Sequence, residues 1–296
     1  MDFKVSMILD GKEYEINGFS YLGEPRSNTC LFVTKKVAHL LTALKNVENC
    51  LIYAEEGINV CEELKLKHAF LYSLTPQLDY ARFANRFADA RFNEEKKLRF
   101  KLSDFGYYVS EDVRIPVDAY IEPGCIIGPD VQIGKNARIL AGSVIRRASI
   151  GDDFYANEYS VVGTNGFTMT EDEEKRRIRI PTLGRVIIGN SVEVGAHDNI
   201  SCGSGGNTVL EDNVKIDALV YIGHDAHLFN NVEIAAGVSI GGFVNVLESA
   251  YIGIHSVIRN RVSIGEHSYI GMGATVTKSV PNRITVVGNP AKPFNK

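Results

Sequence analysis

The chain has 296 residues, of which 45% are hydrophobic and 23% are charged, a balance that indicates a globular protein rather than a disordered one. Its net charge of −4 excludes the basic footprint of a nucleic-acid-binding protein, and it lacks an apolar run of the roughly 18–20 residues that span a membrane. The five cysteines have irregular spacings without a CxxC pair, and the first residues do not read as a signal peptide, so we expect free thiols and a cytoplasmic protein.

Residues 1–105 predict a small α/β domain. Three short apolar runs have the length of strands. Two longer segments, 34–48 and 77–92, repeat apolar residues with the period of a helix, so each has one face that can pack on a sheet. The apolar runs are residues 31–33, 50–53 and 69–72, and the two helical faces contain Val37, Leu40, Leu41, Leu44 and Val47, and Leu78, Tyr80, Phe83 and Phe87.

A repeat of six residues dominates the rest of the chain. Every sixth residue from Leu210 to Val276 is Leu, Ile or Val, and from Val220 to Ala274 the residue two positions earlier is Val, Ala or Ser. Neither the 3.6-residue period of a helix nor the two-residue alternation of a long β-strand produces a repeat of six residues. A short strand followed by a corner does, because Gly, Asn or Asp can turn the chain at positive φ, as in Ile222-Gly223. Three such repeats would close one triangular coil, so we expect a parallel β-helix over residues 106–280.

The lattice also runs upstream, with two interruptions. Its members there are Ile121, Ile127, Ile133, Ile139 and Ile145, then, after a slip of one residue, Ile150, Ala156 and Val162, and finally Ile188, Val194 and Ile200. Residues 163–185 break the lattice and are expected to leave the β-helix as an excursion loop, which in compact folds is often functional. Residues 203–208 form a shorter slip, and residues 281–296 predict a C-terminal cap.

His224 is the strongest candidate for a catalytic residue. It follows Ile222 and Gly223, so we expect it at a corner, pointing out of the coil. Gly242 lies three repeats later and Gly206 lies three repeats earlier, which predicts glycines in the coils above and below the histidine. A neutral imidazole can take a proton from an attacking amine or hydroxyl, and the Gly242 amide could hold a developing oxyanion.

Asp225 directly follows His224 and has two possible roles. It could orient the imidazole, or it could simply be a turn residue, which the pattern slightly favours. The lattice by itself also leaves open that His224 is a solvated surface histidine.

Two segments resemble the UDP-3-O-acylglucosamine N-acyltransferases of lipid A synthesis, which are hexapeptide-repeat enzymes. Residues 179–242, from RIPTLGRVIIGN through IGHDAH to VSIGG, provide most of the likeness, and GTNGF at residues 163–167 is similar to that family's G-x-D-G-F segment. The resemblance implies a left-handed coil, although parallel crossovers are usually right-handed. It also implies a homotrimer with active sites between the subunits.

The same resemblance implies roles for individual residues. His224 would be the general base, with Asp225 beside it and Gly242 as the oxyanion donor. Phe32 and Phe167 would contact a nucleotide sugar, although Phe32 fits the core of a strand equally well.

The chain also departs from that family. Only Phe32 remains of an F-x-x-N-x-x-Y run that stacks the uracil, and Arg261 stands where the family has a second active-site histidine. Ser201-Cys202-Gly203 replaces a D-R-G triplet, and we expect no C-terminal helical extension of the kind that engages acyl carrier protein in that family. The final VVGNPAK instead resembles CoA-using acetyltransferases of the same class. Candidate partners for the acyl-donor phosphates, each of which could equally be a solvated charge, are Arg259, Arg261, Lys278, Arg283 and Lys292.

These observations predict an N-acyltransferase that moves an acyl group from acyl-CoA to the amine of a nucleotide-linked amino sugar, such as a dTDP-linked amino-deoxy sugar of a surface glycan. No bound cofactor or metal is expected. The alternative is lipid A synthesis itself, with UDP-3-O-(3-hydroxyacyl)glucosamine as the acceptor and acyl carrier protein as the donor. A non-catalytic β-helix scaffold remains open. A zinc-dependent carbonic anhydrase is disfavoured because His224 and His227 should project in different directions, and Cys202 is interpreted as a packing or surface cysteine.

Overall fold

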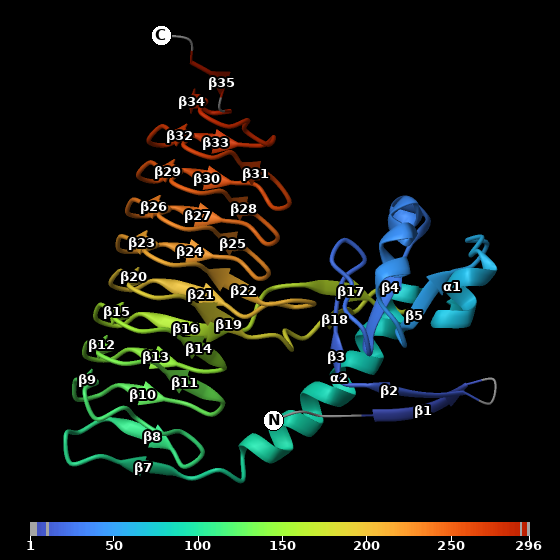
Figure 1. Cartoon of the computed structure of the whole chain (residues 1–296), viewed down its shortest axis with the longest axis horizontal. Helices are drawn as coiled ribbons and strands as arrows, with labels where there is room; N and C mark the ends of the chain where they lie inside the picture. Colours follow the sequence, from blue (N-terminus) through green and yellow to red (C-terminus); the bar gives the residue numbers. More distant parts are fainter. Residues whose placement is uncertain (1–4, 10–11, 291, 295–296) are drawn as a thin grey trace. The chain divides into compact units, whose positions relative to one another are not determined.

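The chain forms two compact units, shown in the computed structural model in Figure 1. The structure describes residues 5–9, 12–290 and 292–294, with side chains from residue 13 onward. The first unit comprises residues 1–95, 167–183 and 204–206, and the second comprises residues 96–166, 184–203 and 207–296. Each unit has hydrophobic clusters of its own.

The first unit contains a four-stranded parallel sheet in the order β3-β4-β5-β6. The 20-residue helix α2 packs against this sheet, and the Phe83 and Phe87 rings of α2 meet Phe19 of β3 in a buried aromatic cluster. Two antiparallel hairpins, β1-β2 and β17-β18, complete the unit. The elements are β1 (Val5–Leu9), β2 (Lys12–Ile16), β3 (Gly18–Phe19), β4 (Thr29–Val33), η1 (Lys35–Asn46), β5 (Leu51–Glu55), α1 (Glu62–Lys67), β6 (Ala69–Ser73), α2 (Pro76–Glu95), β17 (Met169–Glu171) and β18 (Arg177–Arg179).

The three predicted strands and the second predicted helix are confirmed, but the first helix differs from the prediction. η1 is a 3₁₀ helix, which has three residues per turn instead of 3.6. Side chains three positions apart therefore lie above one another, so Leu41 and Leu44 are buried and Val47 packs beside them. Leu40, which the helical pattern placed in the core, is 37% exposed.

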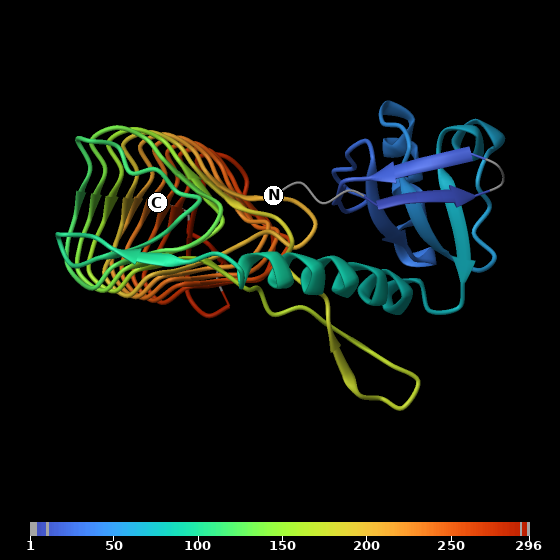
Figure 2. The same cartoon turned by 90° about the horizontal axis from the view of Figure 1, so that it is seen from below.

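The second unit is a β-helix whose short strands form three faces. Figure 2 looks along the stack and shows the strands of successive coils lying over one another. The first face contains β7 (Phe100–Leu102), β8 (Tyr108–Ser110), β10 (Ile126–Ile127), β13 (Val144–Ile145), β16 (Val161–Thr164), β21 (Asn199–Ser201), β24 (Tyr221–Ile222), β27 (Ser239–Ile240), β30 (Val257–Ile258) and β33 (Thr275–Val276). The second contains β11 (Val131–Ile133), β14 (Ala148–Ile150), β19 (Val186–Ile188), β22 (Thr208–Leu210), β25 (His227–Leu228), β28 (Asn245–Val246) and β31 (Ser263–Ile264). The third contains β9 (Tyr120–Ile121), β12 (Arg138–Ile139), β15 (Tyr155–Ala156), β20 (Glu193–Val194), β23 (Lys215–Ile216), β26 (Glu233–Ile234), β29 (Tyr251–Ile252), β32 (Tyr269–Ile270), β34 (Thr285–Val287) and β35 (Lys292–Pro293).

The six-residue lattice is the core of this β-helix. Every predicted lattice residue from Leu210 to Val276 is at most 3% exposed, and the smaller residues from Val220 to Ala274 are at most 6% exposed. In the later coils each strand pairs in parallel with the strand three repeats away, as for Ile222 opposite Ile240. The predicted one-residue slip is present as well, because Val131 lies opposite Ala148, one residue short of three full repeats. Burial of this stacked aliphatic column is the main source of stability for such a coil.

Residues with left-handed backbone mark the corners, but they are not the glycines that the sequence pattern suggested. In the later coils the three corner columns are Asp225, Phe243 and Arg261; Leu219, Gly237, His255 and Gly273; and Asn213, Asn231, Ser249 and His267. Gly223 is outside that region of φ and is needed for space, since a Cβ there would lie 2.6 Å from the Gly242 nitrogen.

The β-helix begins earlier and ends later than predicted. β7 pairs with β8, which continues in parallel onto β10, so residues 96–105 belong to the second unit. β34 pairs in parallel with β32, and β35 then closes the end antiparallel, so the coil extends past residue 280. The predicted excursion loop contains the β17-β18 hairpin, which belongs to the first unit.

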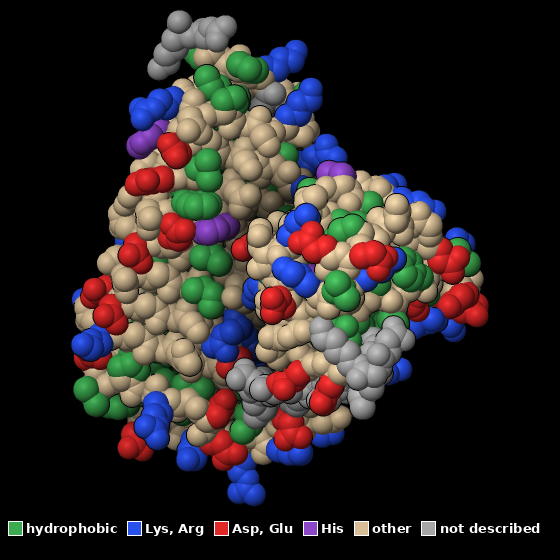
Figure 3. Space-filling view, turned by 45° about the vertical axis from the view of Figure 1, so that its right-hand side comes forward, with side chains coloured by type: hydrophobic (Ala, Val, Ile, Leu, Met, Phe, Trp, Pro, Cys, Tyr) green, Lys and Arg blue, Asp and Glu red, His purple; other side chains and the backbone are tan. Residues whose placement is uncertain are grey.

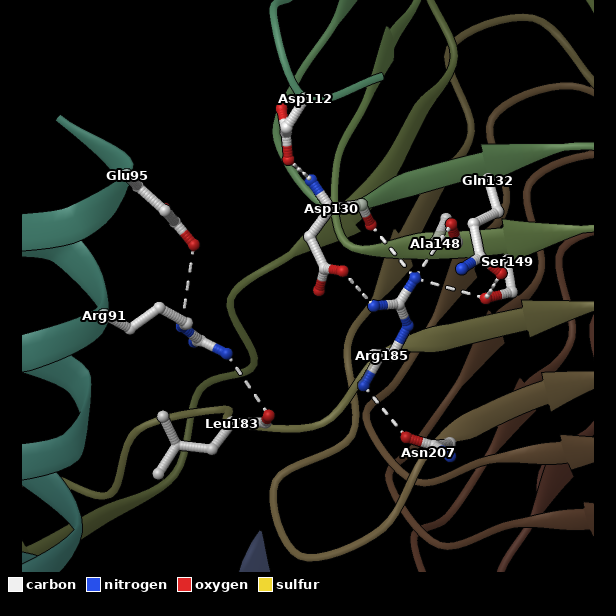
Figure 4. Close-up of polar contacts among 10 residues, drawn as sticks. All are labelled: Arg91, Glu95, Asp112, Asp130, Gln132, Ala148, Ser149, Leu183, Arg185 and Asn207. Atoms are coloured by element: carbon white, nitrogen blue, oxygen red, sulfur yellow. Dashed lines mark hydrogen bonds and ion pairs between the residues drawn. The ribbon is translucent and has the colours of Figure 1, made fainter. Parts of the chain in front are cut away.

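Arg185 fastens the coil where the chain returns from this excursion. Its guanidinium forms an ion pair with Asp130 and donates hydrogen bonds to the backbone oxygens of Asp130 and Ala148 and to the Ser149 hydroxyl (Figure 4). Its backbone amide donates to the Asn207 side chain, 3.0 Å away. These contacts join residues far apart in the sequence, so we assign Arg185 a structural role.

The surface is consistent with the low net charge. Acidic and basic side chains are interspersed over the face shown in Figure 3. Among the described residues, each helix is too short or too polar to cross a lipid bilayer.

Candidate active site

The corner after β24 holds His224 and Asp225 in direct contact. Asp225 has a left-handed backbone (φ 58°), and its carboxylate oxygen lies 2.8 Å from Nδ1 of His224. The backbone amide of Asp225 donates to the hydroxyl of Thr208 at 2.9 Å. The side chains are 14% exposed for His224 and 2% exposed for Asp225. Asp225 is therefore both a turn residue and a partner of the imidazole, so the two roles left open by the sequence occur together.

This contact determines which ring nitrogen can act as a base. A carboxylate only accepts hydrogen bonds, so Nδ1 of His224 must carry the proton and donate a hydrogen bond to Asp225. The lone pair is then on Nε2. A nearly buried carboxylate also stabilises the imidazolium that forms when Nε2 takes up a proton. The pair can therefore accept a proton from a nucleophile and return it later.

Gly242 lies beside this ring in the next coil, as the spacing of three repeats predicts. A Cβ at Gly242 would be 2.8 Å from both Cε1 and Nε2 of His224. The carbonyl oxygen of Gly242 accepts a hydrogen bond from the Arg261 amide, and the Phe243 amide donates one to the His224 carbonyl oxygen. Both N···O distances are 3.0 Å. Within the described part of the chain, no group accepts a hydrogen bond from the Gly242 amide. An N–H next to the base is thus available to an oxyanion.

The coil below His224 contains extra residues, so the predicted glycine beneath the histidine is not confirmed. Ile222 lies opposite Ile200, 22 residues earlier, whereas His227 lies opposite Val209, 18 residues earlier, so four extra residues lie between these two strands. The extra residues leave the coil, and Gly206 belongs to the first unit. Cys202 is fully buried, consistent with a packing residue.

Phe243 is a part of this corner that the sequence analysis missed. Its ring packs edge-on against His224, with 5.2 Å between ring centroids and an interplanar angle of 88°. The guanidinium of Arg261 lies 4.1 Å from the centroid of the Phe243 ring. Asp225, Phe243 and Arg261 follow one another at intervals of three repeats, so this spacing is the signal that could have identified the column.

The two predicted nucleotide-sugar residues are not brought together. Phe32 of β4 is partly buried, with its ring centroid 5.1 Å from that of Tyr80 in α2. Phe167 is 77% exposed, and the Arg179 guanidinium lies 5.6 Å from its ring centroid. Among the described residues, no contact joins the two rings.

The predicted acyl-donor residues separate into two groups. Lys278 and Lys292 line a cavity of about 390 Å³ at the end of the β-helix. Arg261 instead lies over Phe243 at the His224 corner, and Arg259 follows β30 without lining that cavity.

A larger open cavity of about 640 Å³ lies on the third face, where Glu193, Lys215 and Tyr251 are among its lining residues. His224 does not line it, and we place the chemistry at His224 because base and amide donor meet there. Near this cavity, Asp198 is almost fully buried and accepts the backbone amides of Gly195 and Val220, each at 2.7 Å. Its burial raises its pKa to about 7.

His227 has a different environment from His224. Its Nε2 lies 2.7 Å from a carboxylate oxygen of Glu211, and its ring stacks on Phe229. The described residues contain no group of three or more His, Cys, Asp and Glu side chains placed to hold a metal ion.

Comparisons with known proteins agree with the repeat architecture. Residues 112–147 and 207–242 match the family described as bacterial transferase hexapeptide (six repeats). Over 112 residues the chain is 36% identical to the UDP-3-O-acylglucosamine N-acyltransferase of Hydrogenovibrio crunogenus, a match that covers 38% of this chain and 32% of that protein. Over 181 residues it is 29% identical to the protein of the same name from Cupriavidus pinatubonensis, covering 54% of this chain and 49% of that one.

A solved structure shows the same fold. The UDP-N-acetylglucosamine acyltransferase from Campylobacter jejuni has a TM-score of 0.57 and 24% sequence identity to this chain, covering 66% of this chain and 74% of that one. Together with the repeat match, it confirms the expected left-handed parallel β-helix. The chain contains hexapeptide repeats and is similar to UDP-3-O-acylglucosamine N-acyltransferases, and these matches span about a third to a half of the length of the two curated relatives.

Proposed function

We propose that this chain is an N-acyltransferase that moves an acyl group from a thioester to the amine of a nucleotide-linked amino sugar. The observation that supports it is the corner in which Asp225 holds Nδ1 of His224 and the Gly242 amide lies beside the ring. A base and an oxyanion donor next to each other are what acyl transfer to an amine needs.

The reaction follows from these positions. The amine nitrogen attacks the thioester carbonyl carbon, a C–N bond forms, and the proton lost by the nitrogen passes to Nε2 of His224. The carbonyl oxygen becomes an oxyanion and accepts a hydrogen bond from the Gly242 amide. The intermediate then expels sulfur by breaking the C–S bond. The imidazolium returns its proton to the leaving thiolate, which gives a free thiol and an amide.

The names of the curated relatives favour UDP-3-O-acylglucosamine as the acceptor. We therefore propose the lipid A acceptor, which the sequence left as the alternative, ahead of a dTDP-linked sugar for a surface glycan. Acyl carrier protein is the corresponding donor, with acyl-CoA as the competitor. His224 lies on the outside of a coil, so a second copy of the chain in a homotrimer would supply the opposite wall of the site.

Thiol release tests both the activity and the substrates. Purified protein would be given 3-hydroxyacyl carrier protein, 3-hydroxyacyl-CoA or acetyl-CoA, each with UDP-3-O-acylglucosamine or a dTDP-linked amino sugar. We expect release with the carrier protein and the UDP sugar. Release only with a CoA donor and the dTDP sugar would overturn the choice of substrates, and no release from any pair would favour a scaffold.

His224→Ala tests the role of the base. Removal of a general base usually lowers the rate by ~10²–10⁴-fold, so we expect a loss in that range while the oligomer stays intact by light scattering. His255→Ala is the matched control, because His255 is also a corner histidine, with φ 54°, but belongs to another column. If the His224→Ala protein is as active as the His255→Ala protein, His224 is not the general base.

A further inference from the structure

Arg261 is held at the same corner as the proposed base, two coils away. Asp225, Phe243 and Arg261 have φ values of 58°, 60° and 62°, so they repeat one backbone conformation in three successive coils. The amide of Arg261 donates to the Gly242 carbonyl, and the amide of Phe243 donates to the His224 carbonyl. Backbone hydrogen bonds between these coils therefore fix the position of the Arg261 backbone relative to His224.

The Phe243 ring fixes the other end of that side chain. The Arg261 guanidinium carbon is 4.1 Å from the Phe243 centroid, which in turn is 5.2 Å from the His224 centroid. The guanidinium therefore lies within about 9 Å of the centre of the imidazole. Across the described residues, no carboxylate forms an ion pair with Arg261. Its charge is held by a cation–π contact, which leaves its N–H groups to an anion.

Distance decides which anion of the substrates can reach Arg261. In a sugar with its amine on the carbon beside the phosphorylated one, about four bonds join nitrogen to phosphorus, which are therefore about 4–5 Å apart. In an extended pantetheine arm about 13 bonds separate the thioester sulfur from the phosphate, a span of roughly 15 Å. With the amine at His224, only the acceptor phosphate lies within the distance that separates His224 from Arg261.

We propose that Arg261, positioned by Phe243, binds the sugar-linked phosphate of the acceptor, and not the acyl-donor phosphate for which the sequence suggested it. This inference rests on the proposed function and deepens it. It requires an acceptor whose amine is on the carbon next to the one that bears the diphosphate. Phe243 is a positioning residue that holds the guanidinium where this phosphate lies.

Arg261→Met removes the charge and keeps a long side chain. A charge-assisted hydrogen bond to phosphate corresponds to about tenfold to hundredfold in affinity, so we expect KM for the UDP sugar to rise by that factor while KM for the acyl donor stays within about twofold. Arg283→Met is the matched control, because Arg283 is also an exposed arginine at a corner (φ 61°) but lies in another column. Phe243→Leu should raise KM for the sugar by a smaller factor.

Calorimetric titration with UDP-3-O-acylglucosamine gives a second readout that needs no turnover. We expect the Arg261→Met protein to bind it tenfold to a hundredfold more weakly than the Arg283→Met protein. A rise in KM for the donor, or equal sugar binding by the two variants, would overturn the assignment. A wild-type protein that binds the sugar but releases no thiol would refute the proposed reaction and leave the Arg261 comparison valid.

Discussion

Gly242→Ala perturbs the proposed site directly. The added methyl group would lie 2.8 Å from Cε1 and Nε2 of His224 and 3.1 Å from the His224 carbonyl oxygen, whereas non-bonded carbon atoms are normally about 3.5–4.0 Å apart. The imidazole must therefore move by roughly 1 Å. Gly242 is outside the left-handed region, so alanine fits its backbone. A displacement of this size costs about 10²-fold in rate, so we expect kcat to fall by about 10²-fold.

The assay is thiol release, measured as kcat and KM together with a thermal melt. Gly273→Ala is the control, because a Cβ at Gly273 meets nothing within 4 Å and the only cost is its φ of 65°. We expect that variant to lose about 1 kcal/mol of stability and to keep its kcat. If Gly242→Ala keeps the wild-type kcat, the position of the His224 ring does not matter for the reaction, and the proposed role of that ring is refuted.

Two further predictions concern stability. Gly163→Ala would place a Cβ 1.8 Å from the Arg146 carbonyl oxygen at φ 90°, so we expect about 3 kcal/mol or more to be lost in urea unfolding, against about 1 kcal/mol for Gly273→Ala; equal losses would contradict this. Burial raises the pKa of Asp198 to about 7, against about 4 in an unfolded chain, so the folded state alone holds this proton between those pH values. The free energy of unfolding should therefore fall by up to about 4 kcal/mol as pH rises from 4 to 7. Asp198→Asn should remove that slope and the exposed Glu248→Gln should keep it, and an unchanged slope in Asp198→Asn would refute the argument.

The repeat alone was enough to predict the β-helix and its core. A six-residue lattice has one compact solution, in which each strand rests on the strand three repeats away, so contacts between distant residues repeat a local pattern. The same arithmetic places Gly242 beside His224. It could also have identified the column of Asp225, Phe243 and Arg261, although the ring contacts themselves depend on side-chain orientation.

Counting in steps of six residues does not predict neighbours where the chain leaves the repeat. Gly206 is three repeats before His224, but residues 204–206 belong to the other unit, and the strands before and after them have registers that differ by four residues. Leu40 is exposed because η1 adopted a 3₁₀ period that apolar spacing does not distinguish from an α-helix.

Asp225 shows most clearly what only the tertiary structure decided. Its sequence context allowed a turn residue or a partner of the histidine, and both roles depend on a left-handed backbone that directs the carboxylate toward Nδ1. That backbone is held by a hydrogen bond from the Asp225 amide to Thr208 in the preceding coil. A residue pattern records which side chains are available, whereas the direction in which each one points is determined by packing between coils.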